Sequence, residues 1–117
     1  MEYSLVSVVE TRTFRRTAER LLSEIQILEL IVYLSANPDS GVLIKGAAGI
    51  RKLRWATSGR GKSGGVRVIY YFHNQDMPLY LLGVFGKNEK ANLRGAEKNE
   101  LRNLVNELVK LGCRRNE

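Results

Sequence analysis

Residues 50–86 read IRKLRWATSGRGKSGGVRVIYYFHNQDMPLYLLGVFG, and this stretch divides into three strand-like runs separated by two breaks. The runs at 50–56, 66–73 and 79–85 have the alternating, β-branched and aromatic composition typical of strands. The break at 57–65 holds four glycines and predicts a loop, and the break at 74–76 predicts a turn. Because both connections are short, we expect the three strands to pair antiparallel, with the almost wholly apolar third run in the centre of the sheet.

The region before this stretch predicts one strand and two helices. Residues 3–10 are β-branched and partly alternating, as in a strand. Thr11 or Thr13 can cap a first helix. Ser23 and Gln26 have the spacing of a capping box, which predicts the start of a second helix.

The second helix is expected to end at Asn37, because a residue that precedes proline is disfavoured in helical geometry. Its apolar face is predicted to consist of Ile25, Leu28, Ile31 and Val32. Residues 41–49 are small and irregular, which predicts a connection without regular structure.

Residues 96–111 predict a final helix, and Gly112 occupies the position where a glycine often ends a helix. The apolar stripe of this helix consists of Leu101, Leu104, Val105, Leu108 and Leu111. Residues 1–117 are expected to form a single domain. We predict an α+β fold with the order β-α-α-β-β-β-α, in which the helices pack on one face of an antiparallel sheet. The opposite face would then be open and would carry Lys52, Arg54 and Arg67.

The net positive charge of the chain comes from one window. The sequence has 19 Lys and Arg against 12 Asp and Glu, a net charge of +7. Residues 40–75 contain no Asp or Glu, and their seven basic residues are Lys45, Arg51, Lys52, Arg54, Arg60, Lys62 and Arg67. Such a block fits a surface that binds a polyanion, although a solvated basic face without a ligand is the alternative. Like charges close together in a sheet repel one another, so a fold retains them more readily when an anion compensates them.

The glycine-rich loop does not fit a nucleotide-binding P-loop. That motif requires a glycine five residues before the Gly61-Lys62-Ser63 unit, where this chain has Ala56, and it requires a helix where this chain predicts a strand. The loop is better interpreted as a hairpin tip that carries Arg60 and Lys62 to a phosphate backbone.

The sequence has few residues with versatile side-chain chemistry, which limits the kinds of catalytic or metal site that it can form. The single histidine, His73, lies at a strand end and fits a partly buried polar group better than a catalytic group. Tyr71 shares the face of Arg67 and could stack on a base, or it is a tyrosine at the rim of the sheet. One cysteine, Cys113, excludes an internal disulfide and fits a reducing cytoplasm. One His and one Cys do not suffice for a structural zinc site, and the sequence has neither a membrane-spanning run nor a signal peptide at its start.

The chain resembles the RelE/HigB-type toxins of bacterial toxin–antitoxin modules along nearly all of its length. The matching segments are VVETRTFRRTAERLL (8–22), IRKLRWA (50–56), GRGKSGGVRVIYYF (59–72), DMPLYLLGVFGKNEKANL (76–93) and AEKNELRNLVNELVK (96–110). The block at 61–82 is the most specific of them. The resemblance implies a RelE-like fold and an endoribonuclease that cuts mRNA in the ribosomal decoding site. It also implies a cognate antitoxin, expected to be of the helix-turn-helix type, through which alone the toxin would meet operator DNA.

The resemblance also implies which residues act on RNA. The positions that match the family's active site are Lys52, Arg54, Arg67 and Lys87. Further RNA contacts are expected from Arg51, Arg60, Lys62, Tyr71 and Lys90. The sequence departs from the pattern in two places: Asn88 stands where some members have arginine, and no tyrosine occupies the region of Leu93 and Arg94.

A mechanism without a metal or cofactor follows from these residue types. Metal-assisted hydrolysis needs carboxylates or histidines as ligands, and the basic window up to residue 72 has none. The remaining route uses the 2′-hydroxyl of the RNA as nucleophile, with Lys52 as candidate base and arginines that stabilise the phosphoryl charge. Two alternatives stay open: a non-catalytic RNA- or ribosome-binding module, and a protein whose basic face docks an acidic partner.

Overall fold

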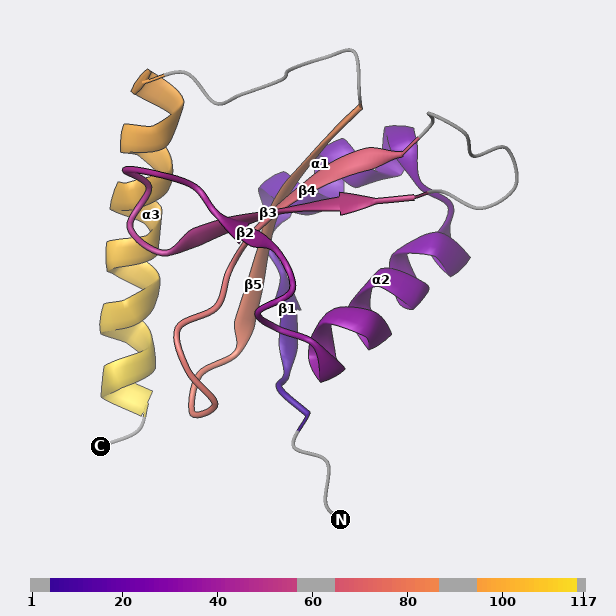
Figure 1. Cartoon of the computed structure of the whole chain (residues 1–117). Helices are drawn as coiled ribbons and strands as arrows, with labels where there is room; N and C mark the ends of the chain where they lie inside the picture. The colour runs from indigo at the N-terminus through magenta and orange to yellow at the C-terminus, as the bar shows by residue number, and fades with distance from the viewer. Residues whose placement is uncertain (1–4, 57–64, 87–94, 116–117) are drawn as a thin grey trace.

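The computed structural model of the chain describes residues 5–56, 65–86 and 95–115. The helices and strands in these ranges are β1 (Val8–Glu10), α1 (Arg12–Leu21), α2 (Glu24–Ala36), β2 (Val42–Leu43), β3 (Ile50–Trp55), β4 (Val66–Tyr71), β5 (Leu79–Gly86) and α3 (Gly95–Arg115) (Figure 1). The α+β class is confirmed, and so is the predicted order of elements. The short strand β2 is an addition, in the region that was expected to lack regular structure. None of the described helices is long and apolar enough to cross a membrane.

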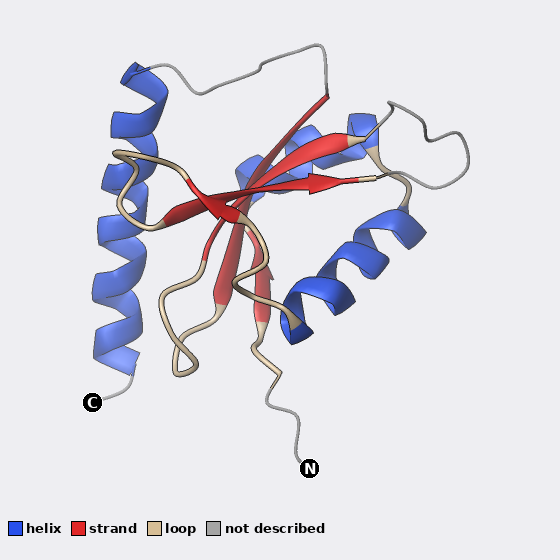
Figure 2. Cartoon of the chain, viewed as in Figure 1, coloured by secondary structure: helices blue, strands red, loops and turns tan. Residues whose placement is uncertain are grey.

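The described strands form a five-stranded sheet in the order β1-β5-β4-β3-β2 (Figure 2). β3, β4 and β5 pair antiparallel, and β5 lies in the interior of the sheet between β1 and β4, as predicted. β1 pairs with β5 in parallel, with Val8 opposite Leu79. The first strand of the chain is thereby placed beside the last one.

The first two helices begin where the capping patterns predict. The Thr11 hydroxyl accepts a hydrogen bond of 3.2 Å from the Phe14 N–H at the start of α1. At the start of α2, the Ser23 hydroxyl accepts from the Gln26 N–H (3.1 Å), and the Gln26 side chain accepts from the Ser23 N–H (2.9 Å). α2 ends with Asn37 as its C-cap. Local sequence signals therefore suffice to set these boundaries.

The sheet buries a core on both of its faces. α1 and α2 cover one face, where Phe14 and Leu30 are fully buried. α3 lies on the other side (Figure 1), where Val105 packs with Ile69 and Tyr71. The prediction that all helices share one face is therefore wrong. The physical reason is that β4 is apolar on both faces, so that both must be covered.

The apolar face predicted for α2 is wrong except for Ile31, which packs against the core. The helix buries Leu30 and Leu34, whereas Ile25, Leu28 and Val32 are exposed. Apolar residues are spread around most of this helix, so their periodicity does not decide which side faces the core.

α3 does not end at Gly112 but continues to Arg115. A glycine inside a helix costs only about 1 kcal/mol relative to alanine, which is not enough to stop a helix that packs on a sheet. Four of the five residues predicted for its apolar stripe do pack in the core, and Leu111, at 50% exposure, does not.

A buried tyrosine fixes the turn that leads from α2 to the sheet. The Tyr70 hydroxyl donates to the Pro38 carbonyl and accepts from the Gly41 N–H, both at 2.8 Å. Burial raises the pKa of Tyr70, so the hydroxyl stays protonated and able to donate. A side chain at Gly41 would place its Cβ 2.9 Å from the Tyr70 ring, so only glycine fits there. The Arg51 guanidinium donates to the Gly41 and Asp39 carbonyls, at 2.8 and 3.2 Å.

We predict that Tyr70→Phe lowers the free energy of unfolding by about 1–3 kcal/mol, because two buried backbone groups lose their partner. Urea denaturation measures the change. Tyr33→Phe is the matched control, since it keeps the ring contact with Trp55 on a partly exposed residue and should change stability by less than about 0.5 kcal/mol. Equal stability of Tyr70→Phe and the parent would show that the hydroxyl does not hold this turn.

Candidate functional site

The pairing of β3 with β4 places three basic side chains on one face of the sheet. Arg54 stands directly opposite Arg67, and Lys52 stands opposite Ile69 in the next row of the same face. Side chains in directly opposite positions have Cβ atoms about 4.5–5.5 Å apart. Lys52, Arg54 and Arg67, named the cationic cluster below, are therefore neighbours, as the sequence predicts.

The arginines of this cluster repel each other unless an anion lies between them. Arg54 is exposed and Arg67 is half-buried. Neither guanidinium forms an ion pair with another residue in the described part of the chain. Like charges directly opposite on a sheet are destabilising, and a phosphate group that accepts hydrogen bonds from both guanidiniums would remove that cost.

α3 covers the far end of this face and leaves the cluster accessible. Ile50, Ile69 and Tyr71 belong to the core beneath α3, and Figure 1 shows α3 beside the start of β3. Arg54 lies near the opposite end of β3 and remains exposed. The open face predicted from the sequence is thus reduced to the end of the sheet that carries Arg54 and Arg67.

Tyr71 and His73 do not join the cluster. Tyr71 is only 5% exposed, so its ring cannot stack on a base as predicted. The same burial raises the pKa of its hydroxyl. Its hydroxyl forms a hydrogen bond of 3.0 Å with His73 Nδ1. His73 follows Arg67 by six residues along an extended segment, a separation of roughly 20 Å, which places the imidazole away from Arg67.

Arg51 lies on the other face of the sheet. Arg51 pairs with Tyr70, and its side chain points away from the face of its chain neighbours Ile50 and Lys52. Its guanidinium binds the turn after α2. The structure therefore does not bring Arg51 to the cluster, although its residue type and position in the sequence suggested an RNA contact.

The other predicted site residues, Arg60, Lys62, Lys87 and Lys90, lie outside the described residues. The described strands nevertheless show where their segments leave the sheet. Trp55 and Gly86 both pair with Val66, next to the row of Arg54 and Arg67. Both segments are therefore attached at the end of the sheet that holds the cluster.

β5 contains a β-bulge that the sequence interpretation missed. Ile69 pairs with Gly83 and Tyr70 pairs with Leu81, so Leu82 is the extra residue. An isolated glycine within an apolar strand is a signal for such a bulge. Bulges redirect side chains and are common beside functional sites.

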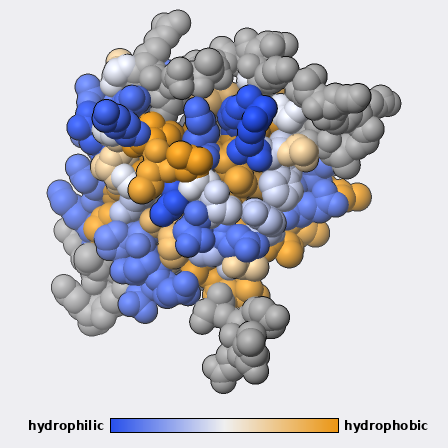
Figure 3. All heavy atoms as spheres, viewed as in Figure 1, coloured by the Kyte–Doolittle hydropathy of each residue, from blue (hydrophilic) through white to orange (hydrophobic). Residues whose placement is uncertain are grey.

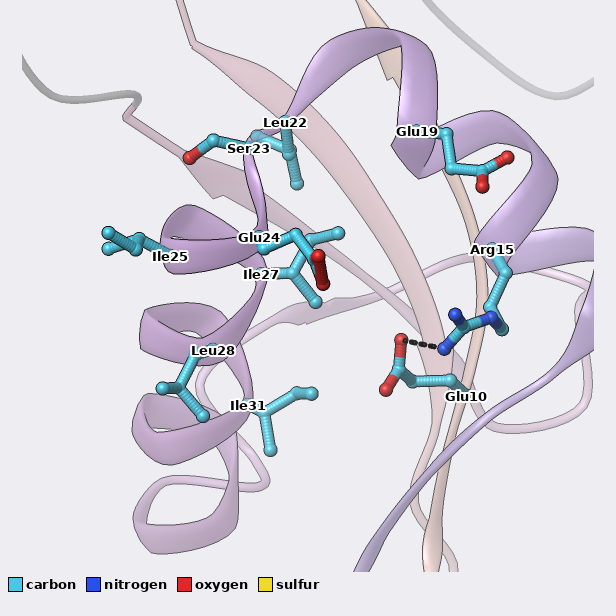
Figure 4. Close-up of a pocket in the computed structure, with 10 residues that line it drawn as sticks. All are labelled: Glu10, Arg15, Glu19, Leu22, Ser23, Glu24, Ile25, Ile27, Leu28 and Ile31. Atoms are coloured by element: carbon cyan, nitrogen blue, oxygen red, sulfur yellow. Dashed lines mark hydrogen bonds and ion pairs between the residues drawn. The ribbon is translucent and has the colours of Figure 1, made fainter.

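A groove lies on the opposite side of the sheet, between α1 and α2 (Figure 4). It encloses about 630 Å³ and is lined by Glu10, Arg15, Glu19, Leu22, Ser23, Glu24, Ile25, Ile27, Leu28 and Ile31. Glu10 and Arg15 form an ion pair of 3.3 Å on the side of the groove that faces α2 (Figure 4). Ile25 and Leu28 are 70% and 60% exposed, and apolar surface appears in Figure 3 on the side where α2 lies. Exposed apolar surface of this kind is typical of protein–protein contacts.

A family model described as the RelE toxin of the RelE / RelB toxin-antitoxin system matches residues 6–115. The match spans every described helix and strand, and it includes the whole cationic cluster. Among the described residues, no group of three or more His, Cys, Asp or Glu side chains is placed to hold a metal ion.

We predict that the cluster binds tetrahedral oxyanions. Sulfate, compared with chloride at equal ionic strength, should raise the free energy of unfolding of the parent more than that of Arg54→Gln or Arg67→Gln. Because sulfate also stabilises proteins non-specifically, Arg12→Gln on the exposed side of α1 is the control and should respond like the parent. In low salt, each cluster variant should be as stable as the parent or more stable by up to about 1 kcal/mol. An identical sulfate response in all four proteins would contradict an anion site.

Proposed function

Because the chain belongs to the RelE family of toxins from toxin–antitoxin systems, we propose that it is an endoribonuclease that stops translation by cutting mRNA on the ribosome. RelE-family toxins are in general ribonucleases, and the family implies an antitoxin partner. The observation that carries the proposal is the pair of directly opposed arginines, which no described carboxylate neutralises. This pair is suited to a phosphodiester, because each guanidinium presents several donors to phosphoryl oxygens.

The proposed reaction uses the nucleophile that RNA itself supplies. Lys52 would accept the proton of the 2′-hydroxyl, and the 2′-oxygen would attack the adjacent phosphorus. The bond from phosphorus to the 5′-oxygen would break, leaving a 2′,3′-cyclic phosphate and a 5′-hydroxyl. Arg54 and Arg67 would stabilise the charge that develops on the phosphoryl oxygens, which is usually the largest single term in such catalysis. DNA lacks the 2′-hydroxyl and would not be cut.

The remaining basic residues have proposed roles that rest on the family resemblance. Lys87 directly follows β5 at the end that holds the cluster and is proposed to protonate the leaving 5′-oxygen. Arg60, Lys62 and Lys90 are proposed to contact the RNA backbone. Such contacts would make the affinity for RNA depend on salt concentration.

The antitoxin is proposed to be of the helix-turn-helix type and to place an acidic segment over the cluster. Residues 40–75 carry seven basic residues and no Asp or Glu, so charge complementarity favours an acidic partner there. The apolar groove between α1 and α2 is the alternative binding site for the antitoxin. Hydrogen–deuterium exchange on the complex distinguishes the two, since protection confined to α1 and α2 would assign the antitoxin to the groove instead.

A non-catalytic RNA- or ribosome-binding module is the second candidate. It is favoured by the absence of a tyrosine near Leu93 and Arg94 and by the distance of His73 from the cluster. A module of this kind would bind RNA with the same salt dependence but would leave it intact.

We predict that Arg67→Ala and Lys52→Ala reduce mRNA cleavage about 100- to 1,000-fold, as the loss of a charge-stabilising donor typically does. Both side chains lie on the sheet surface, so circular dichroism should show an unchanged fold. Arg12→Ala serves as the control for lost positive charge and should retain full activity. Growth arrest after expression of the parent, relieved by the two cluster variants alone, is the corresponding result in cells. If Arg67→Ala arrests growth as strongly as the parent, the cluster is not the catalytic site.

A further inference from the structure

A small cavity lies beside β5, between α1 and α3, close to the cationic cluster. It encloses about 250 Å³, which is less than the ~300–1,000 Å³ typical of sites for drug-sized ligands. Its apolar walls come from Ile69 on β4, from β5 and from Leu101 on α3, where the β5 residues are Leu82, Gly83 and Phe85. Thr13 and Thr17 of α1 complete the wall on the side of that helix. Glu97 and Glu100 of α3 line it as well, and Glu100 is the more exposed of the two carboxylates. The cavity, named the Gly83 pocket below, has room for one small ring system.

The β-bulge creates the space. Because Leu82 is the extra residue, Leu82 and Gly83 both face α3, and Gly83 has no side chain to fill the position opposite Ile69. A Cβ built on Gly83 would meet no atom within 4 Å. The space is therefore open, although its surroundings in the sheet are packed on both sides.

The pocket lies one row away from the proposed phosphate position. Phe85 stands directly opposite Arg67, and Gly83 stands opposite Ile69, which in turn stands opposite Lys52. Neighbouring strands are about 4.8 Å apart. A nucleotide whose phosphate is held by Arg54 and Arg67 can thus reach the pocket with its own or the adjacent base.

We propose that the Gly83 pocket receives a nucleobase that carries an exocyclic amino group, and that the Glu100 carboxylate accepts a hydrogen bond from this group. The inference rests on the proposed function, since it assigns a base-selecting site to the same RNA substrate. Phe85, which is partly exposed, would stack on a flat face of the base.

The charge of Glu100 decides which bases fit. An ionised carboxylate only accepts hydrogen bonds, so it pairs with the amino groups of guanine, adenine or cytosine. Uracil offers a single N–H between two carbonyl oxygens, which the carboxylate repels. An apolar side chain of a protein partner would fit the apolar walls, but it offers no hydrogen-bond donor to the Glu100 carboxylate. The combination of apolar walls, an acceptor and adjacent cations therefore favours a base.

The test compares the cleavage sites of three purified variants with those of the parent. Gly83→Ile fills the pocket, Glu100→Gln exchanges the acceptor for an amide without changing its size, and Glu107→Gln is the charge-matched control farther along α3, where the side chain lies near Lys110. The 5′ ends of the fragments are sequenced from ribosome-bound mRNA in which the bases near the cut are randomised. One wrong hydrogen-bonded base typically costs enough for a roughly tenfold preference.

The parent and Glu107→Gln should disfavour uracil about tenfold at one fixed position relative to the cut. Glu100→Gln should remove most of this preference while cleavage continues, and Gly83→Ile should slow cleavage at preferred sites with an unchanged circular dichroism spectrum. If the parent cleaves RNA and Glu100→Gln retains its preference, the pocket assignment is overturned and the proposed function stands. If both pocket variants leave the cut sites unchanged but weaken antitoxin capture, the pocket receives a protein side chain instead. A parent that cuts no RNA overturns both proposals.

Discussion

The pairing register of β3 with β4 is the constraint on which the site and both cores depend. In this register Arg54 faces Arg67, while Leu53 and Val68 point into the core beneath α1 and α2. A slip of one residue would turn the basic side chains toward that core and the apolar ones toward solvent. The many buried apolar side chains of β4 make such a slip costly, so the packing of the sheet holds two repelling guanidiniums together. An anion that binds between the two guanidiniums relieves this repulsion, and its binding is favoured for that reason.

Features that depend on a few adjacent residues could be predicted from the sequence. The capping box of Ser23 and Gln26 and the alternation of residues 50–56 are of this kind, and the sharing of a face by Lys52 and Arg54 follows from the period of a strand. The location of α3 could not be predicted in this way. Its apolar stripe shows that it must pack on something, but which face of the sheet receives it depends on contacts between distant segments such as Val105 and Ile69. The parallel pairing of β1 with β5 was missed for the same reason.

In the candidate site, too, the roles of single residues depend on packing that the local sequence does not reveal. Arg51 and Arg54 are equally basic and lie on the same strand, yet one binds backbone carbonyls of a turn and the other faces solvent opposite Arg67. Strand alternation separates them, but residue type does not. Tyr71 shares the face of Arg67 as expected, and only the packing of α3 shows that its ring is buried. The bulge at Leu82 depends on how β5 pairs with β4, and the glycine beside it was the only sign in the sequence.

The proposed function requires that the cluster activates the 2′-hydroxyl of the RNA substrate. The most direct measurement is the cleavage of a ribosome-bound mRNA with and without a single 2′-deoxy substitution at the cut position. If Lys52, Arg54 and Arg67 catalyse the attack of the 2′-hydroxyl, the fragments carry 5′-hydroxyl ends and no cut occurs at the 2′-deoxy position. Fragments with 5′-phosphate ends, or undiminished cleavage at the 2′-deoxy position, would contradict it.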